Sequence, residues 1–329
     1  MIQTAIKDTK DVNVRTDSNR SGFASFAAVS SNIGAIEVGA RFAQGTTPFA
    51  VVIGAPGWGK THLLDSIRSY MGRRSQPINS PMSASQYTSV PERCDDGLPL
   101  LIDDCQDVWG NMRARQDFRR LLERRIKGRR PTFVCIADKV SRLEASRFFP
   151  CPQEWAFQSI SVPSRKERDY IVRQIADSEE VSLSRPIVAL VARHLCGDGR
   201  SIKGAIRTLK IVRDDWARRS DLFEACGVLT PYIQGEDGWD PRDVVMDVVS
   251  GRSFECCPSE DYARSVCAYV LLSLMRLDEY DVATFLGVSP TAAYAMSVSV
   301  KASLADANCA KAVEECKDAF VRTLDSETC

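Results

Sequence analysis

Residues 49–61 read Phe-Ala-Val-Val-Ile-Gly-Ala-Pro-Gly-Trp-Gly-Lys-Thr, an apolar run that breaks into a glycine-rich turn. The run Phe49–Ile53 is short, rich in β-branched residues and followed by glycine, which predicts a buried strand. From Gly54 onward the sequence matches G-x-x-x-x-G-K-[ST] without a mismatch, and a helix is predicted over Lys60–Met71. A strand, a glycine turn and a helix in this order predict a phosphate-binding loop, or P-loop.

The chemistry of such a loop assigns a role to each residue type. Glycines let backbone N–H groups wrap around phosphates, and the dipole of the following helix favours an anion at its N-terminus. Lys60 is expected to pair with the β- and γ-phosphates of ATP, and Thr61 to offer its hydroxyl to Mg²⁺. The predicted nucleotide-binding residues are Gly54, Ala55, Pro56, Gly57, Trp58, Gly59, Lys60, Thr61 and His62.

A second apolar run ends in two carboxylates, at Leu100-Leu-Ile-Asp103-Asp104. Alone, such a run is common as a strand end, but it lies about 40 residues after a complete P-loop. Asp103 is therefore expected to hold Mg²⁺ through water, and Asp104 to orient or deprotonate the water that attacks ATP. Lys60, Asp103 and Asp104 are predicted catalytic residues, and Thr61 and Asp103 predicted metal ligands.

The rest of the chain predicts an α/β unit followed by helices. Strands are expected at 98–102, 132–136 and 156–162, and helices at 33–43 and 112–127, which favours a parallel, doubly wound sheet. A capping box at Ser164 and Glu167 opens a helical stretch, with further helices from Pro186 and over 200–216. The predicted domains are a flexible leader at 1–20, a nucleotide-binding α/β domain at 21–163, a helical lid at 164–238 and a small helical domain at 239–329.

Composition sets the broad class. With 44% hydrophobic and 26% charged residues, the chain has the composition of a soluble globular protein. The start of the chain lacks the apolar core of a secretory signal and no apolar run is long enough to cross a bilayer, so we expect a cytoplasmic protein without a membrane partner. Twelve cysteines without a C-x-x-C pair, beside two histidines, predict reduced buried thiols rather than a zinc site.

The formal net charge is zero, but the charges are separated along the chain. Residues 110–130 hold nine basic and two acidic side chains, a balance of +7, whereas the stretch after Pro258 has a balance of −5. The basic helix is a candidate track for nucleic acid. The alternative is a solvated basic face, or one that docks the acidic tail. The candidate nucleic-acid contacts are Arg113, Arg120, Arg124 and Lys127.

With both phosphate motifs placed, the chain resembles the DnaA family of bacterial replication initiators, which are AAA+ ATPases. Residues 54–64, GAPGWGKTHLL, are similar to that family's P-loop, and residues 100–106, LLIDDCQ, resemble its second phosphate motif. Phe23–Phe26 and Ser31-Asn32 resemble the segment that runs under the nucleotide. The resemblance also implies a nucleotide contact at Asp138, although Ala137 replaces the serine that precedes it in the family.

The resemblance implies roles for two arginines. Arg147, in Ser-Arg-Phe, corresponds to the arginine that reaches the ATP of a neighbouring subunit. Arg200 corresponds to the arginine of the lid helix that contacts the γ-phosphate within the same subunit. A fixed guanidinium at either place would stabilise charge on the transferring phosphoryl group, so both are predicted catalytic residues.

The C-terminal stretch resembles the family's helix-turn-helix domain, with one departure. Where the family presents a basic and polar run that reads its DNA site, this chain has Ser289-Pro-Thr-Ala-Ala293. No arginine is present there to reach a guanine edge. Pro290 suits the first turn of a helix, so we expect the fold to persist and the specific readout to be lost or changed.

The leading prediction is a DnaA-like ATPase with slow, switch-type hydrolysis. It would bind ATP and Mg²⁺, assemble with copies of itself through Arg147 and act in the initiation of DNA replication. The alternative is a regulatory adaptor or helicase-loader-like AAA+ protein that binds initiator or helicase subunits without sequence-specific DNA binding. The degenerate segment 289–293 favours the adaptor, whereas the basic helix favours a partner made of DNA.

Overall fold

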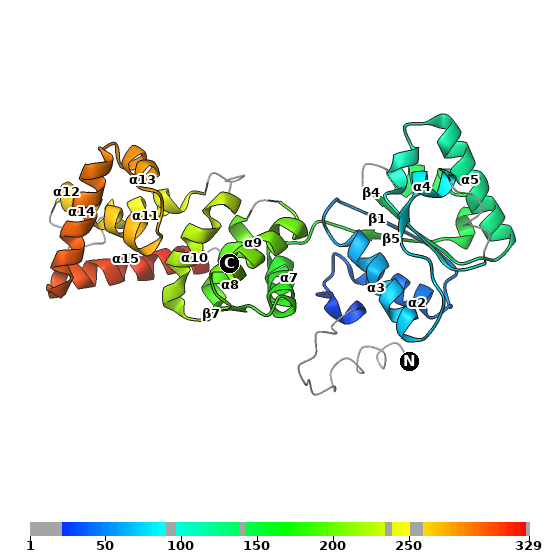
Figure 1. The fold of residues 1–329 in the computed structure, drawn as a ribbon, viewed down its shortest axis with the longest axis horizontal. Coiled ribbons are helices and arrows are strands. Elements are labelled where there is room, and N and C mark those ends of the chain that lie inside the picture. Colours follow the sequence, from blue (N-terminus) through cyan, green and yellow to red (C-terminus); the bar gives the residue numbers. More distant parts are fainter. Residues whose placement is uncertain are drawn as a thin grey trace. The chain divides into compact units, whose positions relative to one another are not determined.

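The computed structural model describes residues 22–89, 97–137, 142–195, 197–233, 239–250 and 259–326. The chain divides into two compact units, Met1–Gln174 and Ile175–Cys329 (Figure 1). The predicted leader, Asp138 and most of the predicted boundary near 235–241 lie outside the described residues. The domain boundaries expected after residues 163 and 238 stay predictions.

The first unit is built on a parallel five-stranded sheet, as the sequence predicted. Its strand order is β2-β3-β4-β1-β5, so the strand before the P-loop lies between two neighbours. The four longer strands confirm predicted ones, whereas β2 was not predicted because two residues carry no recognisable pattern. The strands are β1 (Phe49–Gly54), β2 (Met82–Ser83), β3 (Leu100–Asp103), β4 (Thr132–Ala137) and β5 (Ala156–Ile160).

Helices cover both faces of this sheet because its central strands are buried on both sides. Along β1, Val51 joins the core on one face and Val52 the core on the other. One face is covered by α2 (Ile33–Ala43) and α3 (Lys60–Arg73). The opposite face is covered by α4 (Ala84–Ser89), η3 (Cys105–Val108), α5 (Met112–Lys127) and α6 (Arg142–Phe148). Short 3₁₀ turns lie at η1 (Phe23–Ser25) and η4 (Pro152–Glu154).

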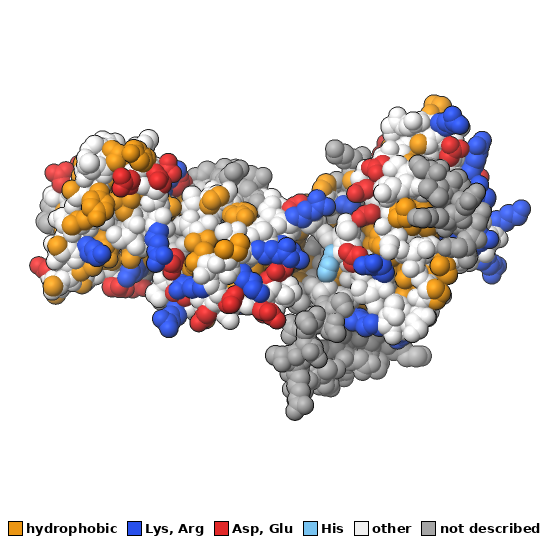
Figure 2. Space-filling view, viewed as in Figure 1, with side chains coloured by type: hydrophobic (Ala, Val, Ile, Leu, Met, Phe, Trp, Pro, Cys, Tyr) orange, Lys and Arg blue, Asp and Glu red, His pale blue; other side chains and the backbone are white. Residues whose placement is uncertain are grey.

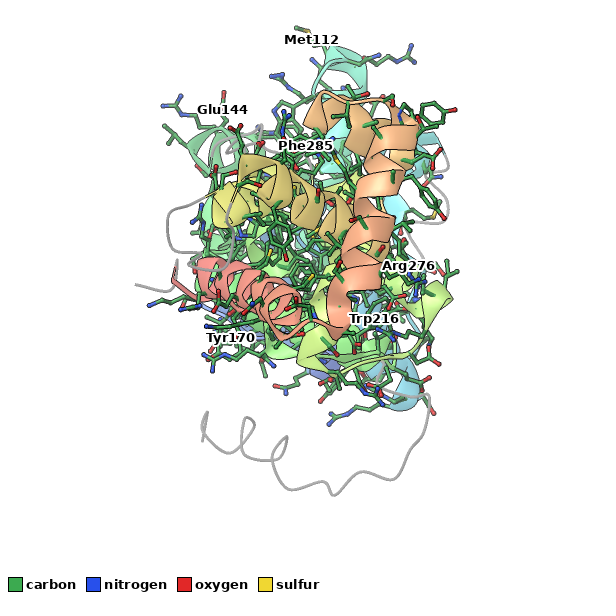
Figure 3. All side chains as sticks on the ribbon, turned by 90° about the vertical axis from the view of Figure 1, so that its left-hand side faces the viewer. Met112, Glu144, Tyr170, Trp216, Arg276 and Phe285 are labelled. Atoms are coloured by element: carbon green, nitrogen blue, oxygen red, sulfur yellow. The ribbon has the colours of Figure 1, made fainter. Side chains whose placement is uncertain are left out.

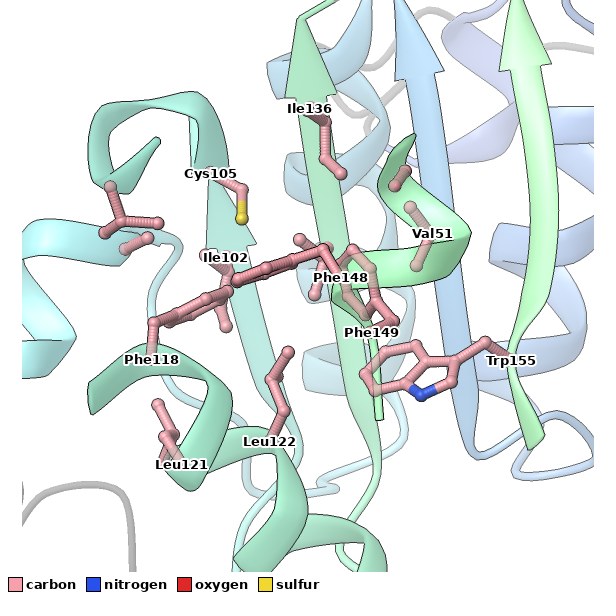
Figure 4. Packing of buried hydrophobic residues seen from close by; sticks show 14 of the residues in the cluster. Val51, Ile102, Cys105, Phe118, Leu121, Leu122, Ile136, Phe148, Phe149 and Trp155 are labelled. Carbon is pink, nitrogen blue, oxygen red and sulfur yellow. The ribbon is translucent and has the colours of Figure 1, made fainter. Parts of the chain in front are cut away.

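Aromatic side chains fill the core on the α5 face (Figure 4). Phe118 of α5 stacks on Phe148 of α6 with ring centroids 6.1 Å apart, and Phe149 meets Trp155 edge to face at 4.8 Å. Leu121 and Leu122 extend the same apolar side of α5. This packing fixes α5 and α6 against the sheet, so the outer face of α5 is held in one orientation.

In the second unit, two parallel strands of two residues each interrupt the expected run of lid helices. The helix predicted to end at Trp216 ends at Val212, because the Trp216 indole is buried and donates to the backbone oxygens of Leu209 and Arg213. The elements are α7 (Arg165–Ser178), which begins in the first unit, β6 (Ser182–Leu183), α8 (Arg185–His194), α9 (Gly199–Val212), β7 (Asp215–Trp216), η5 (Arg219–Asp221), α10 (Leu222–Leu229) and η6 (Thr230–Tyr232).

The C-terminal helices share a core with α8 and α10. Phe320 lies 5.0 Å from Phe223 between ring centroids, and Trp239 stacks on His194 at 3.9 Å. A Cβ at Gly227 would lie 1.6 Å from the backbone oxygen of Met275, so the two backbones approach closely. The elements are α11 (Pro241–Ser250), α12 (Glu260–Tyr269), the π-helical η7 (Val270–Leu274), α13 (Glu279–Leu286), α14 (Pro290–Ala302), η8 (Ser303–Ala305) and α15 (Ala307–Ser326).

Seven cysteines among the described residues carry free thiols, and all but Cys151 are buried, as the sequence predicted. Burial raises the pKa of the Cys267 thiol to about 12, so it stays protonated at neutral pH. Among the described residues, no helix combines the length and the apolar character that crossing a bilayer requires.

Candidate functional site

The P-loop connects the end of β1 to the start of α3. Gly57 and Gly59 have φ angles of 75° and 99°, a region that residues with a side chain rarely adopt. A Cβ at Gly59 would also lie 3.3 Å from the Phe26 ring. Both glycines are therefore required by the backbone path of the loop.

Lys60 is the first residue of α3, and its side chain is buried. The ammonium group donates to the backbone oxygens of Gly54 at 2.7 Å and Ala55 at 3.0 Å. No side chain caps the start of α3, because the N-cap residue is Gly59. The loop is thus folded around a buried cation at the N-terminus of a helix, where an anion is favoured.

The side chains of the two predicted metal ligands, Thr61 and Asp103, are hydrogen-bonded to each other. The Thr61 hydroxyl donates to Oδ2 of Asp103 at 2.6 Å, although the residues come from α3 and from the end of β3. The other oxygen of Asp103 accepts the backbone N–H of Asp104 at 3.0 Å. A hydroxyl and a carboxylate side by side are ligands of the kind that Mg²⁺ prefers.

Gln106 holds the second carboxylate in place. Its amide donates to Asp104 at 3.0 Å, while its own carbonyl accepts the backbone N–H of Ala137 at the end of β4. Asp104 has a φ of 46°, an unusual value for a residue with a side chain. No sequence pattern assigned this role to Gln106. Burial raises the pKa of nearby Asp107, and the charges of Asp104 and Asp103 raise it further.

The segment before α2 packs against the P-loop helix. Ser25 Oγ and His62 Nε2 lie 2.8 Å apart, and the Phe26 ring lies 4.3 Å from the His62 ring. His62, a predicted nucleotide contact, is therefore engaged by the chain itself. Its side chain connects the P-loop to the N-terminal segment.

The start of α7 also reaches the P-loop region. The predicted capping box is present, with Glu167 accepting the N–H of Ser164 at 2.7 Å. Glu167 also accepts the N–H of Ser31 at 2.8 Å, and the first of these bonds makes the larger contribution to a lowered pKa of its carboxyl. The guanidinium of Arg168 lies 5.5 Å from the Trp58 ring centroid. No sequence pattern indicated the contacts to Ser31 and Trp58.

The two predicted catalytic arginines are both exposed. Arg147 is exposed on α6, and its backbone oxygen accepts from Arg119 of α5 at 3.4 Å. Arg200 is exposed in the first turn of α9, which Asp198 caps, and belongs to the second unit. The roles of both arginines stay predictions, as does that of Asp138.

The basic residues of α5 fall into two groups. The four predicted nucleic-acid contacts are exposed, and blue side chains follow the outer edge of this unit in Figure 2. Of these, Arg120 pairs with Asp117 at 3.3 Å. Arg125, by contrast, is 1% exposed and donates to Thr132 Oγ1 at 2.7 Å and to the backbone oxygen of Pro131 at 2.9 Å. Arg125, one of the basic residues counted in the balance of +7, therefore stabilises the fold.

A parallel sheet with a P-loop after β1 and two carboxylates at the end of β3 has the AAA+ type of fold. The solved structure of domain III of DnaA from Thermotoga maritima matches with a TM-score of 0.54 and 19% identity, over 68% of this chain and all of that one. A DnaA structure bound to AMPPCP and single-stranded DNA matches with a TM-score of 0.51 and 17% identity, over 92% of this chain and 98% of that one.

The sequence relatives indicate the same family. DnaA of Thermotoga sp. (strain RQ2) is 22% identical over 222 residues, which cover 60% of this chain and 50% of that protein. DnaA of Wolinella succinogenes is 25% identical over 331 residues, which cover 90% of this chain and 74% of that protein. The chain spans about half the length of the first of these relatives, and no family model matches it. The chain is thus similar in sequence and in fold to the DnaA replication initiators.

Proposed function

We propose that this chain binds ATP with Mg²⁺ at the P-loop. The observation that carries the proposal is the 2.6 Å hydrogen bond between Thr61 and Asp103, beside the buried Lys60 ammonium. Residues 42 positions apart in the chain supply a metal-ligand pair next to a cation at a helix N-terminus. Such a pair fits Mg²⁺, which takes few protein ligands and shares the phosphate oxygens of its nucleotide.

Each side chain then has a defined task. Lys60 would exchange the two loop carbonyls it now holds for phosphate oxygens. Thr61 and Asp103 would hold Mg²⁺, which when bound neutralises charge on the phosphates. Asp104, oriented by Gln106, would position a water molecule and accept its proton. We expect hydrolysis to be slow and to act as a switch.

Self-assembly completes the proposal. An arginine that serves a neighbouring subunit must be exposed and firmly held, and Arg147 has both properties, because Arg119 bonds the backbone at the end of α6. Arg200 would contact the γ-phosphate within the same subunit. Together with the likeness to DnaA, this supports an ATP-dependent oligomer that acts in replication initiation, with DNA held by the exposed basic residues of α5.

A second candidate function is supported by the start of α14. The Ser289 hydroxyl accepts the N–H of Ala292 at 3.2 Å and lies 3.0 Å from the Thr291 hydroxyl. The only two hydroxyls of this segment are thus engaged with each other and with the helix end. This favours an adaptor that binds initiator or helicase subunits without reading a DNA sequence.

Calorimetry with ATP and Mg²⁺ tests the nucleotide site. Lys60→Ala is expected to weaken binding by ~2–4 kcal/mol, because a charge-assisted contact is lost from a buried position. Lys166→Ala is the matched control, since Lys166 is an exposed lysine of the same unit, and it should bind like the wild type. Equal affinity of Lys60→Ala and wild type would disprove the site.

A DNA titration across salt concentrations separates the two functions. If α5 holds DNA, binding weakens steeply with salt, and charge reversal at Arg120 and Arg124 abolishes it. If the chain is an adaptor, no DNA binding is seen at any salt concentration, while ATP binding is retained. A steep slope that survives the charge reversal would contradict the assignment of DNA to α5.

A further inference from the structure

The outer face of α14 carries almost no charge. Among the thirteen residues of this helix, only Lys301 is charged. Tyr294 is 60% exposed and Val298 is also exposed, whereas Ala293 and Val300 are buried on the opposite side. The helix therefore presents apolar side chains on both of its faces.

The helix α13, which packs against α14, begins with exposed acidic residues. Glu279 and Asp281 are exposed in its first turn, and Tyr280 between them is 67% exposed. Figure 2 shows orange side chains over α13 and α14 with red carboxylates beside them, and Figure 3 looks onto the same helices from the end of the unit. We define the acidic-aromatic face by Glu279, Tyr280, Asp281, Tyr294 and Val298.

Exposed tyrosines grouped with valine are typical of a protein interface. Tyrosine is enriched among the residues that dominate binding energy, whereas isolated exposed apolar residues need no explanation. The carboxylates specify the partner further, because they favour a basic surface and repel the phosphates of nucleic acid. The occupant is therefore expected to be a basic protein surface with some apolar area.

The chain itself carries such a surface. Arg113, Arg120, Arg124 and Lys127 are exposed at spacings of seven, four and three residues, which places them along one side of α5. We call these four residues the basic stripe. Met112, exposed at the start of the same helix, supplies apolar area. The formal charge of the chain is zero only because an excess of +7 around α5 is balanced elsewhere, including the −5 of the C-terminal stretch.

We propose that the acidic-aromatic face of one copy docks onto the basic stripe of a second copy. The contact joins two different surfaces, so each added copy leaves one of each kind available and copies can follow one another in a row. The tyrosines supply the buried area, and the charges set the orientation and make the contact sensitive to salt. The contact uses neither the P-loop nor Arg147, so it goes beyond the ATP-dependent assembly proposed above. It does use the residues proposed to hold DNA, so a second copy and DNA compete for the basic stripe.

Sedimentation velocity on the full chain tests the proposal. The protein is treated with nuclease and measured with EDTA and without nucleotide, so the result does not depend on ATP binding. Association is expected at ~50 mM salt and is expected to be lost at ~500 mM, where the Debye length is only a few ångströms. A wild-type chain that is monomeric at low salt and high concentration overturns the proposal.

Charge exchange identifies the two surfaces. Glu279→Lys with Asp281→Lys in one variant, and Arg120→Glu with Arg124→Glu in the other, should each weaken association by about tenfold. Mixing the two variants should restore it, because the intact acidic-aromatic face of one variant then meets the intact basic stripe of the other, and the two reversed surfaces also match. Circular dichroism checks that each variant is folded. If the lysines disturb the first turn of α13, the double variant Glu279→Gln with Asp281→Asn replaces the lysine variant. Failure of the mixture to associate, although both variants are folded, overturns the proposal.

A tyrosine pair tests the apolar part. Tyr294→Ala should weaken association by about tenfold or more, as for an interface anchor. Tyr170→Ala removes a tyrosine of similar exposure, 65%, from α7 and should have no effect. Equal effects of the two variants, or association that disappears on nuclease treatment, would show that nucleic acid or a different surface joins the copies.

Discussion

The helices α3 and α14 begin in opposite ways. The start of α3 has a glycine as N-cap, no capping side chain, and a buried lysine followed by a threonine that reaches Asp103. The start of α14 has Ser289 as N-cap, which accepts a backbone N–H, and a proline that has no N–H to offer. Both helices follow a tight turn, yet only α3 keeps its polar groups directed at a site where an anion and a cation could bind.

The difference separates two uses of a helix N-terminus. A chain that caps its own helix gains stability and gives up a binding site, whereas a glycine N-cap costs stability and leaves the helix dipole available to a ligand. We therefore place ligand chemistry at α3 and protein contacts at α14. A similar contrast between a structural residue and a residue available to a partner occurs within α5, where Arg125 is buried in the fold and Arg124 faces solvent.

The largest effect on stability is expected at Arg125. Arg125→Ala removes buried hydrogen bonds to Thr132, Pro131 and Leu98, so the free energy of unfolding should fall by ~3 kcal/mol or more. Arg124→Ala, one position away and exposed, should change it by less than ~0.5 kcal/mol. Urea unfolding measures both, and similar losses for the two variants would show that the basic residues of α5 are not divided in this way.

Ser289 tests the comparison of helix starts directly. Ser289→Ala should lower the free energy of unfolding by ~1 kcal/mol, because the cap of α14 is lost. It should leave ATP and DNA affinities unchanged, whereas Lys60→Ala should abolish most ATP binding. A thermal melt, an ATP titration and a DNA titration on both variants measure these effects. If Ser289→Ala weakened DNA binding tenfold, α14 would be a DNA-reading helix after all.

The sequence predicted most of the first unit and less of the second. Strands around the P-loop are marked by unbroken apolar runs such as Phe49–Ile53, and α5 was predicted with its observed ends because Gly128 follows an amphipathic pattern. The end of α9 was wrong because Trp216 is buried through tertiary contacts that a local pattern does not report. The partners of Glu167 and Arg168 were not predictable, since Ser31 and Trp58 lie more than a hundred residues away.

The smallest effect is expected at the start of α7. Hydrogen bonds from Ser164 and Ser31 lower the pKa of Glu167, so its ionised form stabilises the folded state. This stabilisation is present above the pKa of an unfolded glutamate, roughly 4.3, and is lost as pH falls through the lower folded pKa. Glu167→Gln should therefore lower Tm slightly at pH 7, and the difference from wild type should vanish in acid. A Tm difference that grows as pH falls would contradict this assignment.

Complementation of two inactive variants tests whether a copy of this chain hydrolyses ATP with the help of an arginine from a neighbouring copy. Arg147→Ala lacks the arginine offered to a neighbour, and Asp104→Asn lacks the carboxylate that positions water. Each variant alone should hydrolyse ATP at no more than about a tenth of the wild-type rate while still binding it. An equal mixture should recover part of the activity, because some interfaces then pair an intact Arg147 with an intact Asp104. Full activity of Arg147→Ala alone, at a rate per molecule independent of protein concentration, would contradict the account.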